Sequence, residues 1–305
     1  LVIFVHGMGC YTLLVLMQTW VNTIQFKGNK GLMVALYSTA ISVGIAVGPI
    51  VVNIVGSNSA DWASITALFD FVSVNTGLEL SSDKSVAFGI AAVLSAFGML
   101  PVLVFWAVIP NVSFGGTARI WKTISQSKGA MFSMAMAGVS NFSVAAFITI
   151  YGLKNGLSFA DASLLLTAFM FGSLMLEVPI AALSDYFDRR YFIVGCTLTC
   201  LVCAVYLPIA IYNPVNAWVL VFVWGGTIAA IYSVALAIIG ERYTDPDEQI
   251  AANAGYSLME SIGGTMGILA IGSSMTLIGT DGMPYIIMFA SLVYFSFALT
   301  RYPVE

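Results

Sequence analysis

Charged side chains are scarce in this sequence. Lys, Arg, Asp and Glu make up only 9% of the 305 residues, whereas hydrophobic residues make up 59% and the mean hydropathy is +0.95. Soluble domains use about 45–50% apolar residues. The composition therefore excludes a soluble globular protein and predicts an all-α integral membrane protein. The net charge of −4 carries little weight in such a chain, and no nucleic-acid partner is expected.

Histidine and cysteine, the residues that most often bind metal ions, are also scarce. His6 is the only histidine, and the four cysteines all lie in hydrophobic runs, where we expect apolar packing. A metal site needs convergent histidine or carboxylate ligands as well. We therefore expect no metal site and no cofactor.

An intramembrane enzyme needs a nucleophile with a base, or paired catalytic carboxylates. The sequence has no G-x-S-G motif with a second-helix histidine, and Glu177 and Glu260 are expected at different depths. We assign no catalytic residues and predict that the protein is not an enzyme.

Uncharged runs long enough to cross a membrane cover most of the chain. A span takes about 20 helical residues. The run 191–240 has no charge, and Tyr212-Asn213-Pro214 is its only plausible break, which predicts a hairpin of two spans. The nine predicted spans lie near 1–24, 32–56, 86–109, 129–152, 161–183, 191–212, 215–240, 250–276 and 282–300.

Basic residues are distributed unevenly between the two sides of these spans. One side holds nine lysines and arginines, and the other holds only Lys84 and Lys154. Because cytoplasmic loops are enriched in Lys and Arg, the pattern predicts a cytoplasmic C-terminus and an external loop over 57–85. The nine on the cytoplasmic side are Lys27, Lys30, Arg119, Lys122, Lys128, Arg189, Arg190, Arg242 and Arg301.

A short internal repeat relates residues 37–48 to residues 256–267. The two segments, YSTAISVGIAVG and YSLMESIGGTMG, share five of twelve residues at a constant offset of 219. The repeated glycines, Gly44 with Gly48 and Gly263 with Gly267, suit close helix packing in lipid. The segments are the second and eighth spans, so the repeat unit is six helices. By this count, three helices would precede the chain, which would hold nine of an original twelve.

The motif "VPIAALSDYFDRR" resembles the loop signature of the major facilitator superfamily of secondary transporters, in a form similar to that of a little-characterised bacterial branch. Leu183, Ser184, Asp185, Arg189 and Arg190 match that signature. "QTWVN" at 18–22 is similar to the E-S-W-L-N of the same branch, with Gln18 in place of the acid. Gly44, Gly48 and Pro49 match an exporter-associated G-x3-G-P motif.

The resemblance implies a bundle of two halves that transports a small solute by alternating access, with export and proton antiport as the expected mode. It divides the chain into a partial N-terminal bundle (1–109), a cytoplasmic loop (110–128) and a complete C-terminal bundle (129–305). Its expected place is the bacterial inner membrane. A transporter-like receptor or scaffold remains the alternative.

The resemblance also implies a gating role for Asp185, Arg189 and Arg190. The carboxylate would dock on the first turn of the helix that begins near Gly31, where unpaired N–H groups favour an anion. The alternative is an ordinary positively charged cytoplasmic loop.

Two intramembrane acids are the candidates for proton coupling. An acid inside a span is costly and should face a cavity or a partner. Glu177 would either carry a proton or cation or extend the gating network, and Glu260 would either carry a proton or bond a neighbouring helix. Three amides are further candidates to line a central cavity: Gln18, Asn22 and Asn141.

Overall fold

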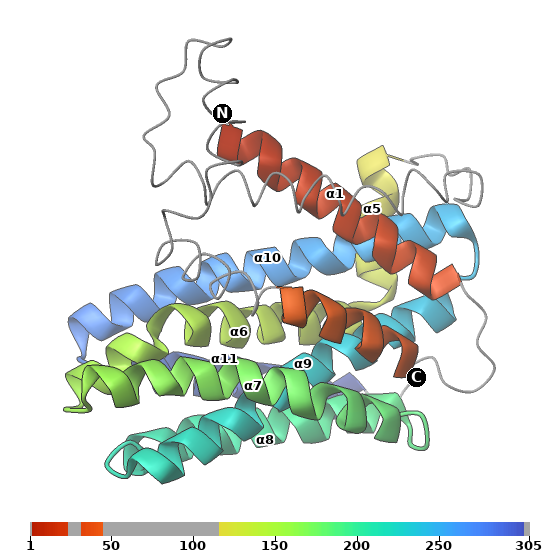
Figure 1. Cartoon of the computed structure of the whole chain (residues 1–305). Coiled ribbons are helices and arrows are strands. Elements are labelled where there is room, and N and C mark those ends of the chain that lie inside the picture. The colour runs from red at the N-terminus through yellow and green to blue at the C-terminus, as the bar shows by residue number, and fades with distance from the viewer. Residues whose placement is uncertain (1, 24–31, 45–115, 302–305) are drawn as a thin grey trace, which may run out of the picture. The chain divides into compact units, whose positions relative to one another are not determined.

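The computed structural model describes residues 2–23, 32–44 and 116–301, which are mostly helical. Within 116–301 the helices are joined by short turns. Residues 1–42 and 112–305 belong to one compact unit, whose described part is shown in Figure 1. The helices are α1 (Val2–Thr23), Leu32–Gly44, α5 (Gly116–Gln126), α6 (Lys128–Lys154), α7 (Phe159–Leu183), α8 (Arg189–Ala210), α9 (Pro214–Arg242), α10 (Pro246–Leu277) and α11 (Gly282–Arg301).

Four of the described helices, α6 to α9, are long and apolar enough to cross a membrane. The predicted class, a helical membrane bundle, is confirmed by them. The chain breaks between α8 and α9 at Ile211–Asn213, where Pro214 begins the second helix. The predicted span 86–109, the external loop 57–85 and the residues Gly48 and Pro49 lie outside the described residues.

Several helices begin at side chains that cap their free N–H groups. Ser158 accepts a hydrogen bond from the backbone N–H of Asp161 at the start of α7, and Asp188 accepts one from Arg190 at the start of α8. Asp245 does the same for Glu248 in α10, with Pro246 at the first helical position. Asp188, one of the two acids in the segment "SDYFDRR", therefore serves as the N-cap of α8.

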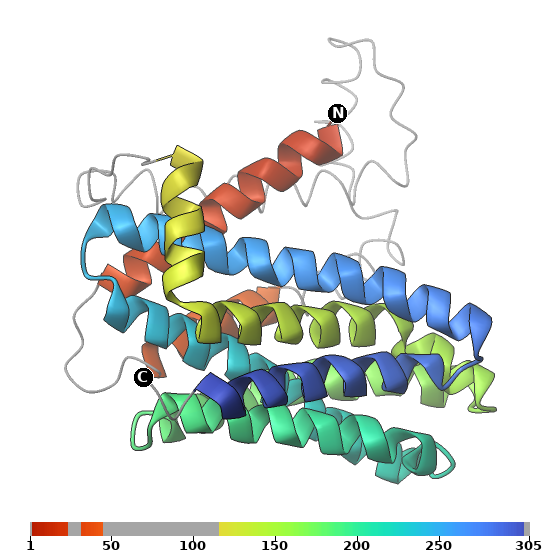
Figure 2. The same ribbon diagram turned by 180° about the vertical axis from the view of Figure 1, so that it is seen from behind.

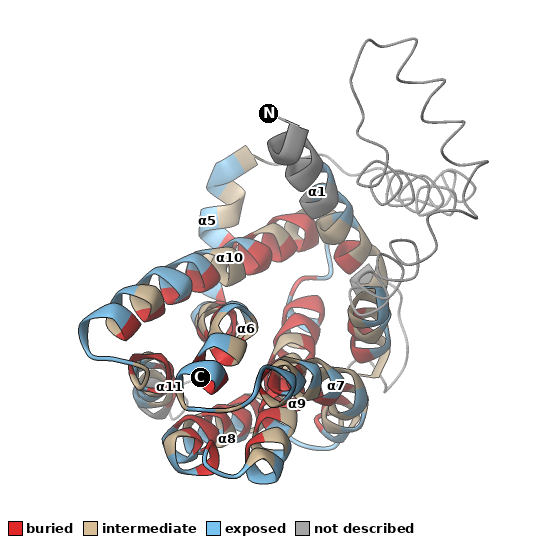
Figure 3. Cartoon of the chain, turned by 60° about the vertical axis from the view of Figure 1, so that its left-hand side comes forward, coloured by how far each residue is buried: buried red, intermediate tan, exposed pale blue. Residues whose placement is uncertain are grey.

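Two closely packed helix pairs form the centre of the bundle. Helix α7 packs along α9. Helix α6 packs along α10 (Figure 2). Buried residues lie on the sides of the helices that face one another, and exposed residues lie on the outer sides (Figure 3). Many of the outer residues are large and apolar, as expected for a surface in contact with lipid tails.

Gly263 shows how closely α10 approaches α6. A Cβ atom added at this position would overlap the backbone carbonyl of Ala135. Because lipid tails are as apolar as the side chains, helices in a bilayer associate through such close backbone contact. The small residue is therefore required by the packing of α6 against α10.

We expect Gly263→Ala to lower the thermal stability of the protein, because the added methyl group forces the backbones of α6 and α10 apart. Such overpacking lowers the free energy of unfolding by about 1–3 kcal/mol. A thiol-reactive dye can report unfolding, since Cys196, Cys200 and Cys203 are buried. Gly195→Ala is the matched control, because no atom lies within 4 Å of a Cβ at that exposed position of α8. Equal unfolding temperatures for the two variants would contradict the packing argument.

The segment 110–128, expected as a loop between bundles, contains helix α5. Its position is set by contacts with α10 and α6. The prediction of a loop is corrected here, because α5 is helical but shorter and more polar than a membrane span.

Candidate functional site

A cluster of charges lies where α7 ends and α8 begins. Arg189 Nη2 is 2.6 Å from Asp185 Oδ1, and Arg189 Nη1 is 2.5 Å from Glu241 Oε1 on α9. The side chains of Asp185 and Arg189 are only 6% and 12% exposed, whereas Glu241 is 55% exposed. The arginine thus joins the turn that follows α7 to the last turn of α9 through charge-assisted contacts.

The same carboxylate reaches a helix from the first part of the chain. The backbone N–H of Leu32 donates to Asp185 Oδ2 at 3.3 Å, at the start of the described helix Leu32–Gly44. An anion is stabilised there because the first N–H groups of a helix have no internal partners. Asp185 therefore connects residues 153 positions apart in sequence.

A cavity of about 800 Å³ opens beside this cluster. Arg190, which is partly exposed, lines it together with Arg242. The full lining is Ser184, Asp185, Phe187, Asp188, Arg189, Arg190, Ile238, Glu241 and Arg242.

Glu177 lies on α7 eight residues before Asp185 and is fully buried. Its Oε1 accepts a short hydrogen bond from the hydroxyl of Ser233 on α9. Ser38, on the helix Leu32–Gly44, lies beside the same carboxyl. The second oxygen, Oε2, is buried without a hydrogen-bond partner among the described residues. Glu177 therefore lies at the junction of three helices, in surroundings that contain hydroxyl groups.

Gln18 forms the centre of a second buried polar contact. Its Nε2 donates to the hydroxyl of Tyr232 on α9 at 2.7 Å, and its Oε1 accepts from Ser257 on α10 at 3.3 Å. Nearby, the amide of Asn253 donates to the hydroxyl of Thr19 at 2.9 Å. Helix α1 thus meets α9 and α10 through matched polar groups within an apolar bundle. These residues, with Glu177, Ser233 and Ser38, are called the polar layer below.

The remaining predicted residues are less closely connected. Glu260 is partly exposed on α10, where its backbone carbonyl contacts Gly138. Asn141 is partly exposed on α6. Gly44 is exposed, with no atom within 4 Å of a methyl group added there, and the side chain of Asn22 is outside the described part. Gly267, like Gly263, faces α6 closely, at Val139 and Ser143.

Sequence reasoning missed several members of these contacts. Tyr232 and Ser233 lie in the long uncharged run of α9, and Glu241 stands next to Arg242 at the end of that run. The one available signal was the placement of polar residues inside or at the end of a span, where each needs a partner.

Two comparisons with known proteins bear on this arrangement. The family model described as Major Facilitator Superfamily matches residues 130–305. The uncharacterised MFS-type transporter YfkF of Bacillus subtilis (strain 168) is 24% identical over 203 residues, which cover 65% of this chain and 46% of the relative. The chain spans about half the length of this curated relative. Both matches point to a transporter rather than an enzyme.

Proposed function

Because the chain belongs to the Major Facilitator Superfamily, to which its residues 130–305 match, we propose that it moves a small solute across a membrane by alternating access. The observation that carries the proposal is the buried polar layer between α1, the helix Leu32–Gly44 and the helices α7, α9 and α10. Polar groups inside a membrane bundle are costly, and they commonly mark the path of a substrate or an ion.

In this proposal the cluster around Asp185 is a gate. Its contact with Leu32 joins the first part of the chain to α7, and Arg189 joins α7 to α9. Release of Asp185 from the helix start would free the two parts to separate at this end. Arg190 and Arg242 line the neighbouring cavity together with Asp188 and Glu241, so its lining carries charges of both signs.

Glu177 is the proposed proton carrier. An ionised carboxylate buried without a cation is very unfavourable, and no ion pair to Glu177 exists among the described residues. The closed arrangement therefore holds the neutral acid, and water that enters on opening would let the proton leave. Glu177 also contacts Ser233 and Ser38 on both sides of the junction, which couples its proton to the state of the gate. Glu260 is the second candidate.

The proposed direction is export in exchange for protons, in the bacterial inner membrane with the C-terminus in the cytoplasm. The excess of basic residues at the end of the bundle that carries Asp185 supports this orientation. The export mode is supported by the resemblance at Gly44, Gly48 and Pro49 alone.

Flux in proteoliposomes tests the function directly. We expect a pH-sensitive dye trapped in the vesicles to report proton movement when one member of a panel of small solutes is added outside, and to stay silent in protein-free vesicles. Solute movement measured in the same vesicles would establish transport. A solute that binds the protein but never crosses the membrane would contradict the proposal and favour a receptor.

A further inference from the structure

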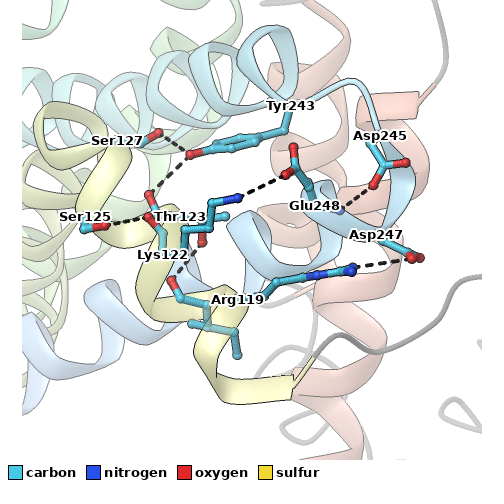
Figure 4. Close-up of polar contacts among 10 residues, drawn as sticks. Arg119, Lys122, Thr123, Ser125, Ser127, Tyr243, Asp245, Asp247 and Glu248 are labelled. Atoms are coloured by element: carbon cyan, nitrogen blue, oxygen red, sulfur yellow. Dashed lines mark hydrogen bonds and ion pairs between the residues drawn. The ribbon is translucent and has the colours of Figure 1, made fainter.

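Helix α5 is fixed across the start of α10 by paired charges (Figure 4). Arg119 Nη1 lies 3.4 Å from Asp247 Oδ2, and Lys122 Nζ lies 3.7 Å from Glu248 Oε1. The hydroxyl of Thr123 between them is buried and lies 2.8 Å from the carbonyl oxygen of Ile120 in its own helix and 3.3 Å from that of Ala251 on α10. The two acids stand in the first turn of α10, where a negative charge is already favoured.

The corner between α5 and α6 is held by a third contact. The hydroxyls of Ser127 and Tyr243 are 3.0 Å apart, and the Tyr243 hydroxyl donates to the backbone carbonyl of Thr123 at 3.3 Å (Figure 4). Ile124 packs directly on α10, because a Cβ atom on Gly255 would lie 2.9 Å from its Cγ1. The position of Ile124 is therefore fixed by polar contacts on both sides.

Ile124 forms one wall of a groove of about 330 Å³ between α5, α6, α10 and α11. This volume is at the lower end of the roughly 300–1,000 Å³ of ligand pockets. All but one of its lining residues are apolar: Ile124, Lys128, Met131, Phe132, Met259 and Phe297. Phe132 and Phe297 meet edge to face, with ring centroids 5.1 Å apart, which gives one wall a defined shape.

Lys128 is the one charged residue of this lining, and it is exposed at the first position of α6. The neighbouring cations Arg119 and Lys122 are already paired with acids, whereas Lys128 has no ion pair within the described ranges. A groove with apolar walls and one available ammonium group is complementary to a molecule with an apolar chain and an anionic head. A water-soluble anion would leave the apolar walls unused.

The place of the groove identifies the source of such a molecule. It lies at the end of the bundle where α6 begins and α11 ends, which the distribution of basic residues predicts to be cytoplasmic. Trp121, on the adjacent helix α5, is 60% exposed, and tryptophan is enriched where membrane and water meet. Anionic lipids at a membrane surface attract basic residues near it.

We propose that this groove binds one anionic phospholipid, with an acyl chain against Met131, Met259 and Phe297 and the phosphate near Lys128. The site is separate from the polar layer and does not depend on the transported solute. It also joins the α5 segment to α10 and α11 through a bound lipid. A change in the anionic lipid content of the membrane would therefore act on helix α5.

Native mass spectrometry can test the site with defined lipids. The protein, released from nanodiscs with equal amounts of phosphatidylglycerol and phosphatidylcholine, should retain phosphatidylglycerol preferentially. We expect Lys128→Gln to weaken this retention about fivefold, since one lysine near a membrane surface contributes about 1 kcal/mol. Lys154→Gln is the matched control, because this lysine is exposed at the opposite end of the same helix.

Two further variants test the contact with the acyl chain separately from the contact with the lipid head group. Met259→Trp and Ile124→Trp should each fill the groove and reduce phosphatidylglycerol retention without changing that of phosphatidylcholine. Unchanged retention in Lys128→Gln and in both tryptophan variants would overturn the proposal, as would equal retention of the two lipids. Glycerol phosphate has a phosphate but no acyl chain. If it displaced phosphatidylglycerol as strongly as a second lipid does, only the head group would be bound, and the proposal would be overturned. Retention of neither lipid would overturn the proposal as well, because it would mean that other protein segments cover the groove.

Discussion

Asp185→Asn is expected to shift the protein towards forms that are open at the Asp185 end. The change keeps the size of the side chain but removes the charge shared by Arg189 and the N–H of Leu32. Hydrogen bonds to charged groups contribute about 1.5–3 kcal/mol. The ratio of closed to open forms should therefore fall by roughly tenfold to a hundredfold.

The populations can be measured as distances between spin labels. Leu36 and Leu183 are exposed labelling positions on the two sides of the contact, and the described native cysteines are buried and so protected from the label. Cys10 would be replaced by serine. We expect a larger share of long distances in Asp185→Asn, together with slower transport and unchanged expression.

Asp188→Asn provides the matched control for this experiment. It removes the same charge three residues away, but Asp188 is exposed and serves as the N-cap of α8, where asparagine caps equally well. We expect its distance distribution and transport rate to match those of the original protein. If both variants behave alike, the cluster is an ordinary charged loop and the gating proposal fails.

Glu177→Gln should abolish proton-driven transport while leaving solute exchange in place. Glutamine retains an oxygen that accepts from Ser233, so the three-helix junction should remain packed. It cannot take up or release a proton, so net movement that depends on the proton gradient should stop. Exchange of labelled for unlabelled solute needs no net proton transfer and should continue.

Glu260→Gln distinguishes this acid from the other candidate. Glu260 is partly exposed on α10, and no hydrogen bond joins its side chain to Ser233 or Gln18 in the described residues. We expect Glu260→Gln to keep proton-driven transport, measured with the same pH-sensitive dye. Intact proton-driven transport in Glu177→Gln, with normal thermal stability, would assign Glu177 to packing alone.

The sequence determined the class of fold because the solvent acts on each residue locally. Twenty or so uncharged residues must form a helix in lipid, whatever lies beside them. The predicted spans at 129–152, 161–183 and 191–212 agree with α6, α7 and α8 within a few residues. The break between α8 and α9 at Asn213-Pro214 was predictable for the same reason, since proline constrains its own backbone.

The partners of the candidate residues were decided by the tertiary structure. Glu177 and Ser233 are 56 residues apart, and Gln18 and Tyr232 are 214 apart, so no local pattern in the sequence pairs them. Glu241 is equally remote from Arg189, and its role became visible only when α9 was placed beside α7.

Helix α5 shows the same limit for secondary structure. Its eleven residues are about the length at which an isolated helix is marginal. The helix depends on α10, which supplies Asp247, Glu248 and the space over Gly255. Composition and span length identified a membrane bundle, because they reflect transfer from water to lipid. The contacts of Asp185, the polar layer and the groove beside α5 became visible only in the packed structure, because each consists of side chains brought together from distant parts of the chain.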